Sequence, residues 1–201
     1  CYDTFTGFKF MAEKKNALEA AGEGKVIFSY EESYGYMLGD YVRDKDAVTA
    51  SMLLTEMAAW YAAQGMTLFD ALNALYEKYG YYAEKTHNLV MPGLDGLRDM
   101  AELMRKLKDE PPTEIAGTEV VVRKDYNDGT VHDCHTGAVT KMELSGSNVL
   151  RFELADGTTI LARPSGTEPK IKVYILARGK DAADAAANVE KYGAWAEALK
   201  G

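Results

Sequence analysis

The stretch VLRFELADGTTILARPSGTEPKIKVYILAR, residues 149–178, decides the fold of the second half of this chain. Three segments in it have the short, β-rich apolar character of strands: Val149–Leu154, Thr158–Arg163 and Ile171–Arg178. Asp156-Gly157 separates the first two segments, and an Asp-Gly pair between alternating runs favours a tight β-hairpin. The stretch therefore predicts a series of strands that begins with a hairpin.

The segments before this stretch predict two further strands and one helix. Tyr81–Val90 and Glu119–Lys124 are predicted to be strands. Between them, an amphipathic helix is marked by Leu97, Met100, Ala101, Met104 and Leu107. Pro111-Pro112 ends this helix, because proline lacks the backbone N–H that a helix interior needs.

The last segment predicts a second helix on the sheet. Asp181 is the expected N-cap, and the inward positions are Ala185, Val189, Tyr192 and Leu199. Residues 125–147 are polar and rich in turn residues, so we expect an exposed hairpin or excursion there. Residues 81–201 are thus predicted to form a small α+β domain, with a mainly antiparallel sheet covered by helices.

Residues 1–80 have the helix, strand, helix order of an α/β layered domain, of which we expect only the last part to be present. The predicted elements are a helix over residues 8–21, a strand at Lys25–Ser29, a loop over 29–41 and a helix over Asp46–Gln64. Asp46–Gln64 carries only Asp46 and Glu56 as charged residues, which predicts burial on most sides.

A further helix is predicted to begin at Thr67, which with Asp70 resembles a capping box. Its apolar stripe is Leu68, Leu72, Leu75 and Tyr79, and Gly80 ends it. The character of the chain changes there, so we place the domain boundary at about residue 80 and expect a hinge near residues 78–82.

Composition excludes several classes of protein. The net charge of −8 argues against nonspecific nucleic-acid binding, which depends on Lys and Arg that neutralise phosphates. No apolar run approaches the roughly 20 residues that span a bilayer. Two scattered cysteines, Cys1 and Cys134, fit a reducing, cytoplasmic compartment. The chain begins at Cys1 inside what looks like packed structure, so we expect a fragment of a longer protein.

RPSGTEPK, residues 163–170, is the most informative stretch for function. Pro164 restricts φ, Gly166 permits a positive φ, and Ser165 and Thr167 bring hydroxyl groups. A turn of this kind directs several backbone N–H groups at one spot, where Arg163 can add a bidentate contact to an oxyanion. The alternative is a plain β-turn, since these are ordinary turn residues.

SYEESYGY, residues 29–36, is the second candidate site. Glu31 and Ser33 offer a carboxylate and a hydroxyl, which suit the vicinal hydroxyls of a sugar. Glu31 and Glu32 could equally be a general acid/base pair. The third alternative is a solvated acidic loop.

Both stretches resemble the α-D-phosphohexomutase family of phosphoglucomutases and phosphomannomutases. The family's phosphate loop has the pattern Arg-x-Ser-x-Thr-Glu-Pro, and residues 163–169 match every fixed position. The family's Glu-x-Ser sugar-specificity loop matches Glu31 and Ser33. The segment TGFKF resembles a Thr-Gly-aromatic-Lys segment, whose lysine, here Lys9, is implied to take part in proton transfer or phosphate contact.

The resemblance implies a reaction for the parent protein. Members of the family interconvert hexose 1-phosphate and hexose 6-phosphate through a phosphoserine and a hexose bisphosphate intermediate. They need Mg²⁺, held by an Asp-x-Asp-x-Asp loop. Neither the serine motif nor the metal loop occurs in this chain, so the implied fragment would bind hexose or pentose phosphate and be inactive without the missing N-terminal domains. Arg163, Ser165, Gly166 and Thr167 would bind phosphate.

Two other functions stay open on the sequence. The chain can be a stand-alone sugar-phosphate-binding or regulatory module, or both loops can be turns that bind nothing. Arg43 is a candidate either for a phosphate contact or for a salt bridge to acidic neighbours. The stretch 125–129 suggests a calcium loop, but its spacing favours a turn, and His132 and His135 lack the spacing of metal ligands.

Overall fold

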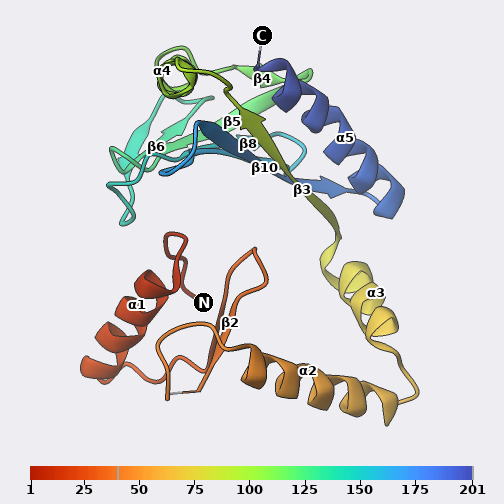
Figure 1. The fold of residues 1–201 in the computed structure, drawn as a ribbon. Coiled ribbons are helices and arrows are strands. Elements are labelled where there is room, and N and C mark those ends of the chain that lie inside the picture. The colour runs from red at the N-terminus through yellow and green to blue at the C-terminus, as the bar shows by residue number, and fades with distance from the viewer. Residues whose placement is uncertain (40, 201) are drawn as a thin grey trace. The chain divides into compact units, whose positions relative to one another are not determined.

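The structure is a computed structural model that describes residues 1–39 and 41–200. It separates into two compact units, Cys1–Ala74 and Leu75–Gly201, and each is described by itself. Figure 1 shows the chain from its red N-terminus to its blue C-terminus. The expected succession of an α/β part and an α+β part with a mainly antiparallel sheet is confirmed.

The N-terminal part is built from helices around a short hairpin. Its elements are α1 (Phe8–Ala20), β1 (Phe28–Tyr30), β2 (Tyr36–Leu38), α2 (Ala47–Ala62) and α3 (Leu68–Tyr79). The strand predicted at Lys25–Ser29 is wrong in position, because only Phe28–Tyr30 faces the antiparallel partner β2. The sequence analysis missed β2, which is too short to show a period-two pattern.

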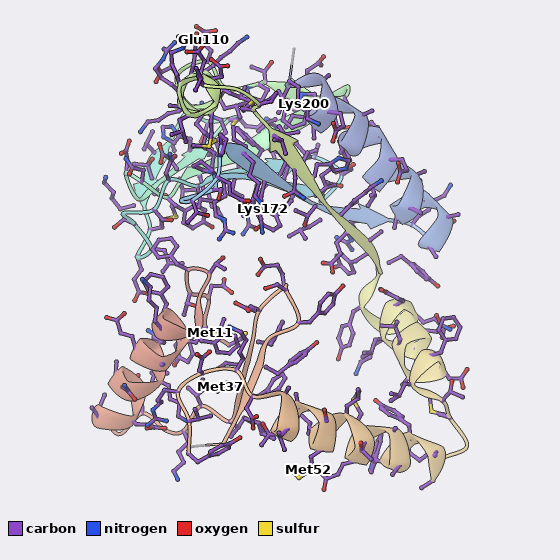
Figure 2. All side chains as sticks on the ribbon, viewed as in Figure 1. Met11, Met37, Met52, Glu110, Lys172 and Lys200 are labelled. Carbon is purple, nitrogen blue, oxygen red and sulfur yellow. The ribbon has the colours of Figure 1, made fainter. Side chains whose placement is uncertain are left out.

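Helix α2 differs from its prediction in burial. It begins after Asp46, as predicted, and the Asp46 carboxylate accepts from the N–H groups of Val48 and Thr49. It has no buried residue, and Val48 and Trp60 are 78% and 61% exposed. The expectation of burial on most sides is therefore wrong for the described chain. An apolar helix is buried only where other elements cover it, and Met52 projects from α2 with no cover (Figure 2).

Helix α3 has the predicted start and an uncovered stripe. The Asp70 carboxylate accepts from the Thr67 backbone N–H at 2.8 Å, and the Thr67 hydroxyl accepts from the Asp70 N–H at 3.1 Å, so the capping box is confirmed. Among its residues only Ala71 is buried. Leu72, Leu75 and Tyr79 are 44%, 48% and 60% exposed.

The C-terminal part is an eight-stranded sheet with two helices. Its elements are β3 (Tyr81–Val90), α4 (Gly96–Asp109), β4 (Glu114–Ile115), β5 (Thr118–Asp125), β6 (Thr130–Asp133), β7 (Val139–Lys141), β8 (Leu150–Leu154), β9 (Thr159–Pro164), β10 (Lys170–Gly179) and α5 (Ala182–Ala198). The strand order is β3-β10-β9-β8-β5-β6-β7, with β4 beside β5, and every pairing is antiparallel.

Strand β10 shows how the sheet acquires one dry face. Ile171, Val173, Ile175 and Ala177 are all fully buried, and the residues between them are not. Both α4 and α5 contact β10 and lie on the same side of the sheet (Figure 1). Lys172 lies on the opposite side, away from the helices (Figure 2). The core thus lies between one face of the sheet and the two helices.

Two predictions about the C-terminal part are confirmed, and the structure adds detail to a third. Asp181 caps α5 by accepting from the Asp184 N–H, and Asp156-Gly157 joins β8 to β9 in a hairpin. Residues 125–147 do contain a hairpin, formed by β6 and β7. Its strands also extend the main sheet beyond β5, which the sequence analysis did not foresee. No helix in residues 1–39 and 41–200 is long and apolar enough to cross a membrane.

Candidate functional site

The turn between β9 and β10 is held in place by its two ends. The Ser165 backbone N–H donates to the Lys170 carbonyl at 2.8 Å, and the Met91 N–H donates to the Pro169 carbonyl at 2.8 Å. A Cβ on Gly96, the first residue of α4, would lie 3.1 Å from Pro169 Cβ. Pro169 therefore packs against the end of β3 and the start of α4. The Glu-Pro end of the motif anchors the turn, while the Ser-Gly-Thr part faces outward.

The outward part of the turn gathers hydrogen-bond donors. The Ser165 Oγ lies 3.4 Å from the Thr167 backbone nitrogen and 3.3 Å from that of Glu168, and it accepts from both. Gly166, Thr167 and Glu168 are exposed. No heavy atom lies within 4 Å of the position that a Cβ on Gly166 would take. The turn thus leaves room for a ligand to approach the backbone closely.

Gly166 permits a positive φ but does not adopt one. It is not among the glycines with a positive φ. The amides of Thr167 and Glu168 converge because the Ser165 hydroxyl accepts from both, which is a serine turn and not a nest built on a left-handed glycine. The lack of a side chain at Gly166 still keeps the approach open.

Arg163 stands beside this turn on the uncovered face of the sheet. Its cross-strand neighbour is Lys172, so the two side chains share one face. The Arg163 Cζ lies 5.7 Å from the centre of the Tyr174 ring. Within the described residues no carboxylate pairs with Arg163. Lys172 was not singled out in the sequence, because only the register of β9 and β10 sets it opposite Arg163.

Glu168 and Lys170 form an ion pair at the base of the turn. The hydrogen bond from Lys170 lowers the pKa of the Glu168 carboxyl below its usual value. The charge of Lys170 is thereby balanced within the protein. Arg163 and Lys172 are left as the cations that can act on an anion at this turn.

The hairpin of β1 and β2 carries the second candidate group. The Glu31 backbone N–H donates to the Gly35 carbonyl at 3.0 Å and closes the loop between the strands. Glu32, Ser33 and Tyr34 form its exposed tip. Tyr34 has a φ of 64°, which costs about 1–3 kcal/mol for a residue with a side chain and occurs preferentially at binding sites.

Glu31 is held against the hairpin by a glycine. A Cβ on Gly35 would lie 2.7 Å from the Glu31 Oε1 and 2.7 Å from the Phe8 ring. Any other residue at 35 would displace the carboxylate or the ring. The Lys45 Nζ lies 5.2 Å from the centre of the same Phe8 ring. Gly35 thus joins the surroundings of Glu31, and Lys45 lies over the Phe8 ring; neither was singled out as a site residue by the sequence pattern.

Lys9 is not brought to Glu31 or Ser33. It is exposed, and its Nζ lies 4.7 Å from the centre of the Phe10 ring. In residues 1–39 and 41–74 it makes no hydrogen bond or ion pair with either residue. A cavity of about 490 Å³ does reach Glu31 and Glu32, but the N-terminal residues 1–6 line much of the rest of it. Ser33 and Lys9 do not line this cavity.

Comparison with known proteins shows that both candidate loops lie in segments that match models of one protein family. Residues 88–191 match the family model described as "Phosphoglucomutase/phosphomannomutase, C-terminal domain". Residues 1–79 match "Phosphoglucomutase/phosphomannomutase, alpha/beta/alpha domain III". The chain belongs to the phosphoglucomutase/phosphomannomutase family. The turn at Ser165 lies in the first match, and Lys9, Glu31 and Ser33 lie in the second.

Individual relatives give the same result. A phosphoglucomutase of Staphylococcus aureus strain N315 is 35% identical over 187 residues, which is 93% of this chain and 33% of the relative. The enzyme of the bovine strain RF122 is 36% identical over 173 residues, covering 86% and 31%. The chain therefore spans about a third of the length of the phosphoglucomutases it matches.

A solved structure shares the fold. The open form of the exocytosis-sensitive phosphoprotein pp63/parafusin, a phosphoglucomutase from Paramecium, aligns with a TM-score of 0.59. The alignment has 20% sequence identity and covers 96% of this chain and 33% of that one. At this identity the likeness concerns the fold alone.

Three other residues or segments that the sequence singled out make contacts within the protein. The Arg43 Nη2 lies 3.3 Å from the Glu19 Oε2, so Arg43 forms a surface ion pair. The Asp125 carboxylate accepts from the Asn127 N–H at 2.8 Å and pairs with Lys108 at 2.9 Å, which makes residues 125–129 a turn. His135 pairs with Glu119 at 3.5 Å.

The residues described by the structure do not fit a magnesium site. The family resemblance implies Mg²⁺, and Mg²⁺ prefers carboxylate oxygens. In residues 1–39 and 41–200, no group of three or more His, Cys, Asp or Glu side chains is arranged to hold a metal ion.

Proposed function

We propose that this chain is the sugar- and phosphate-binding part of a phosphohexomutase, an isomerase that interconverts hexose 1-phosphate and hexose 6-phosphate. The family membership supports this proposal. The observation that carries it is the turn in which Ser165, Gly166 and Thr167 stand beside Arg163, a guanidinium that lies over the Tyr174 ring and has no carboxylate partner in the described residues. Residues 1–80 would be the end of the third domain and residues 81–201 the fourth, with a hinge near 78–82.

The turn suits a phosphate that is held but not transferred. Arg163 offers a planar guanidinium that binds two phosphate oxygens at once, and Lys172 adds a second positive charge on the same face. The Ser165 and Thr167 hydroxyls and the Gly166 N–H supply further donors, because the Thr167 and Glu168 N–H groups already donate to the Ser165 hydroxyl. These contacts depend on the shape and charge of the phosphate and not on the carbon that carries it. The same turn can thus accept the substrate in both orientations.

Glu31 and Ser33 would hold the sugar. A carboxylate accepts hydrogen bonds on both oxygens, so Glu31 can hold two neighbouring hydroxyl groups. Glucose, mannose and pentose phosphates all offer such groups. Lys9 is the candidate for proton transfer or phosphate contact, and its exposed amine would have to leave the Phe10 ring to reach a ligand.

The remaining chemistry would lie outside this chain. A phosphoserine would donate its phosphoryl group to the sugar phosphate, giving a bisphosphate that returns the other phosphoryl group. Phosphoryl transfer depends mainly on positioning and charge stabilisation, and Mg²⁺ supplies part of that charge when bound. We propose that the parent enzyme is cytoplasmic, in keeping with the two free, exposed cysteines, and that this chain alone is inactive.

Titration of the chain with glucose 6-phosphate and with glucose tests the proposal. Amide NMR signals of Gly166 and Thr167 are expected to shift with glucose 6-phosphate only, because the phosphate provides the charge that Arg163 binds. Arg163→Ala should abolish the shift. Arg105→Ala is the matched control, since Arg105 pairs with Asp109 on the surface of α4. Equal responses to both sugars would contradict the assignment of the turn.

A mutase assay tests the second half of the proposal. The chain alone should not convert glucose 1-phosphate to glucose 6-phosphate, even with Mg²⁺ and glucose 1,6-bisphosphate present. Turnover at the rate of a normal phosphoglucomutase would show that the required nucleophile lies within these 201 residues.

A further inference from the structure

A second cavity lies in the C-terminal part, beside β5 and β6. Its volume is about 410 Å³, which is within the range of small-molecule sites. The residues that matter for its chemistry are Arg123, His132, Cys134, Pro111, Pro112 and Thr113. Strand β8 separates β5 from β9 in the sheet order, so this cavity is distinct from the turn at Ser165.

Arg123 and His132 enter the cavity from neighbouring strands. They are directly opposite each other in the pairing of β5 with β6, so both side chains lie on one face of the sheet. Arg123 is also opposite Phe152, whose side chain is in the core, which identifies this face as the one that α4 and α5 cover. Both residues are half-buried.

Neither side chain has a partner in the described chain. In residues 1–39 and 41–200, no hydrogen bond, ion pair or ring contact involves the Arg123 guanidinium or the His132 imidazole. The other arginines all have one. Arg43, Arg98, Arg105 and Arg151 pair with carboxylates, and Arg163 and Arg178 lie over tyrosine rings.

The acidic residues at the cavity do not balance Arg123. The Asp133 carboxylate accepts from the Thr136 N–H, which lowers its pKa most, and also from the His135 N–H. Asp133 is opposite Val122, and Val122 is opposite Glu153 on β8, so the Asp133 side chain is directed to the other face of the sheet from Arg123. The Glu119 carboxylate is 57% exposed and lies 3.5 Å from His135.

A half-buried guanidinium without a partner is unusual in a chain with a net charge of −8. We propose that this cavity binds a small oxyanion, a phosphate or carboxylate group carried by a metabolite. Arg123 would bind two of its oxygens, and His132 and the Thr113 hydroxyl would donate to a third. Pro111 and Pro112 form an apolar wall for the body of the ligand. The site would serve an effector, because it lies apart from the turn at Ser165.

Inorganic phosphate and citrate are the probes, tested on the whole chain carrying Arg163→Gln to remove binding at the turn. Amide NMR signals of Arg123 and His132 should shift with at least one probe and not with chloride at equal ionic strength. Arg123→Gln should weaken binding about tenfold or more, because a charged hydrogen bond is lost. His132→Gln should weaken it less. Arg105→Gln is the charge-matched control and should leave affinity unchanged.

Cys134 provides an independent reading without substitution at the site. Its thiol is exposed and lines the cavity, and Cys1 is an exposed thiol elsewhere. A bound anion should slow alkylation of Cys134 by iodoacetamide and leave Cys1 unchanged. The inference is overturned if neither probe shifts the two signals or protects Cys134, or if Arg105→Gln weakens binding as much as Arg123→Gln. Binding of phosphate but not citrate would indicate that the ligand carries a phosphate group, and binding of citrate but not phosphate would indicate a carboxylate group.

Discussion

Helix α2 and strand β10 are both rich in apolar residues, yet they end in opposite surroundings. The fully buried residues of β10 belong to one continuous core with α4, α5 and the neighbouring strands. Helix α2 has no buried residue at all. An apolar sequence pattern predicts that a surface is buried. It does not predict whether the element that buries this surface belongs to the same chain. The two elements therefore differ in stability although their compositions predict the same burial.

Hydrogen exchange on the whole chain should show this difference most strongly. We expect the amides of β10 to exchange at least about a thousandfold more slowly than those of α2, because core elements open only with global unfolding. An isolated helix of this length is marginal in water, so α2 should exchange near the rate of a free peptide. Similar protection in both elements would mean that α2 is covered in solution.

Two truncations in the two elements sharpen the comparison. Ile175→Ala should lower the free energy of unfolding by about 2–5 kcal/mol, because the side chain is fully buried. Leu54→Ala in α2 should change it by no more than about 0.5 kcal/mol, because Leu54 is 53% exposed. Urea denaturation measures both. If Leu54→Ala lowered the free energy of unfolding as much as Ile175→Ala, the expected difference in burial between α2 and β10 would be contradicted.

Tyr192 offers a test of polar burial in the C-terminal part. Its ring is fully buried, and its hydroxyl donates to the Asp156 carboxylate and lies 2.9 Å from the Thr118 Oγ1. Tyr192→Phe should destabilise the chain by about 1–3 kcal/mol, since Asp156 and Thr118 lose a buried partner. Tyr30→Phe, at an exposed ring in β1, is the control and should have no measurable effect.

The same residue predicts a pH dependence. Burial raises the pKa of the Tyr192 phenol from 10.0 to about 12, with the Asp156 hydrogen bond as the second cause. A raised pKa in the folded state gives a stabilisation that is complete below pH 10 and is lost as the pH rises towards 12. The difference in stability between the wild type and Tyr192→Phe should therefore shrink over this interval. A constant difference would show that the phenol does not titrate with folding.

The two aspartate caps give the smallest expected effects. Asp181→Ala should lower the free energy of unfolding by about 1 kcal/mol, because α5 is packed on the sheet. Asp46→Ala removes an equivalent cap from α2, but it should reduce helicity locally and leave the global free energy within about 0.5 kcal/mol. Circular dichroism combined with urea denaturation separates the two outcomes. If both variants lowered the global free energy of unfolding equally, α2 would unfold cooperatively with the core.

Much of the sheet was predictable because its signals are local. The strands predicted at Tyr81–Val90 and Thr158–Arg163 agree with β3 and β9 to within a residue. Turn and capping residues such as Asp156, Asp181 and Thr67 act on their immediate neighbours, so their roles could be inferred from sequence. Strands β2 and β4 were missed, and the hairpin expected within residues 125–147 could not be placed as β6 and β7, because strands this short acquire their identity from pairing.

The candidate sites divide in the same way. The turn from Arg163 to Thr167 is contiguous, so its residue types and their exposure were open to prediction. The contact of Glu31 with Gly35 was not, because it depends on how the hairpin folds back upon itself. Ligand binding at the turn is tested by the glucose 6-phosphate titration, and binding at Glu31 and Ser33 stays a prediction.

The sequence by itself determined the order of the elements, the turns and caps between them, and the phosphate-type motif, because each depends on residues a few positions apart. Only the tertiary structure decided which apolar surfaces are covered, and which cations stand together. Lys172 beside Arg163 and His132 beside Arg123 are products of strand register. Register depends on the pairing of distant segments, and such pairing leaves no local pattern in the chain.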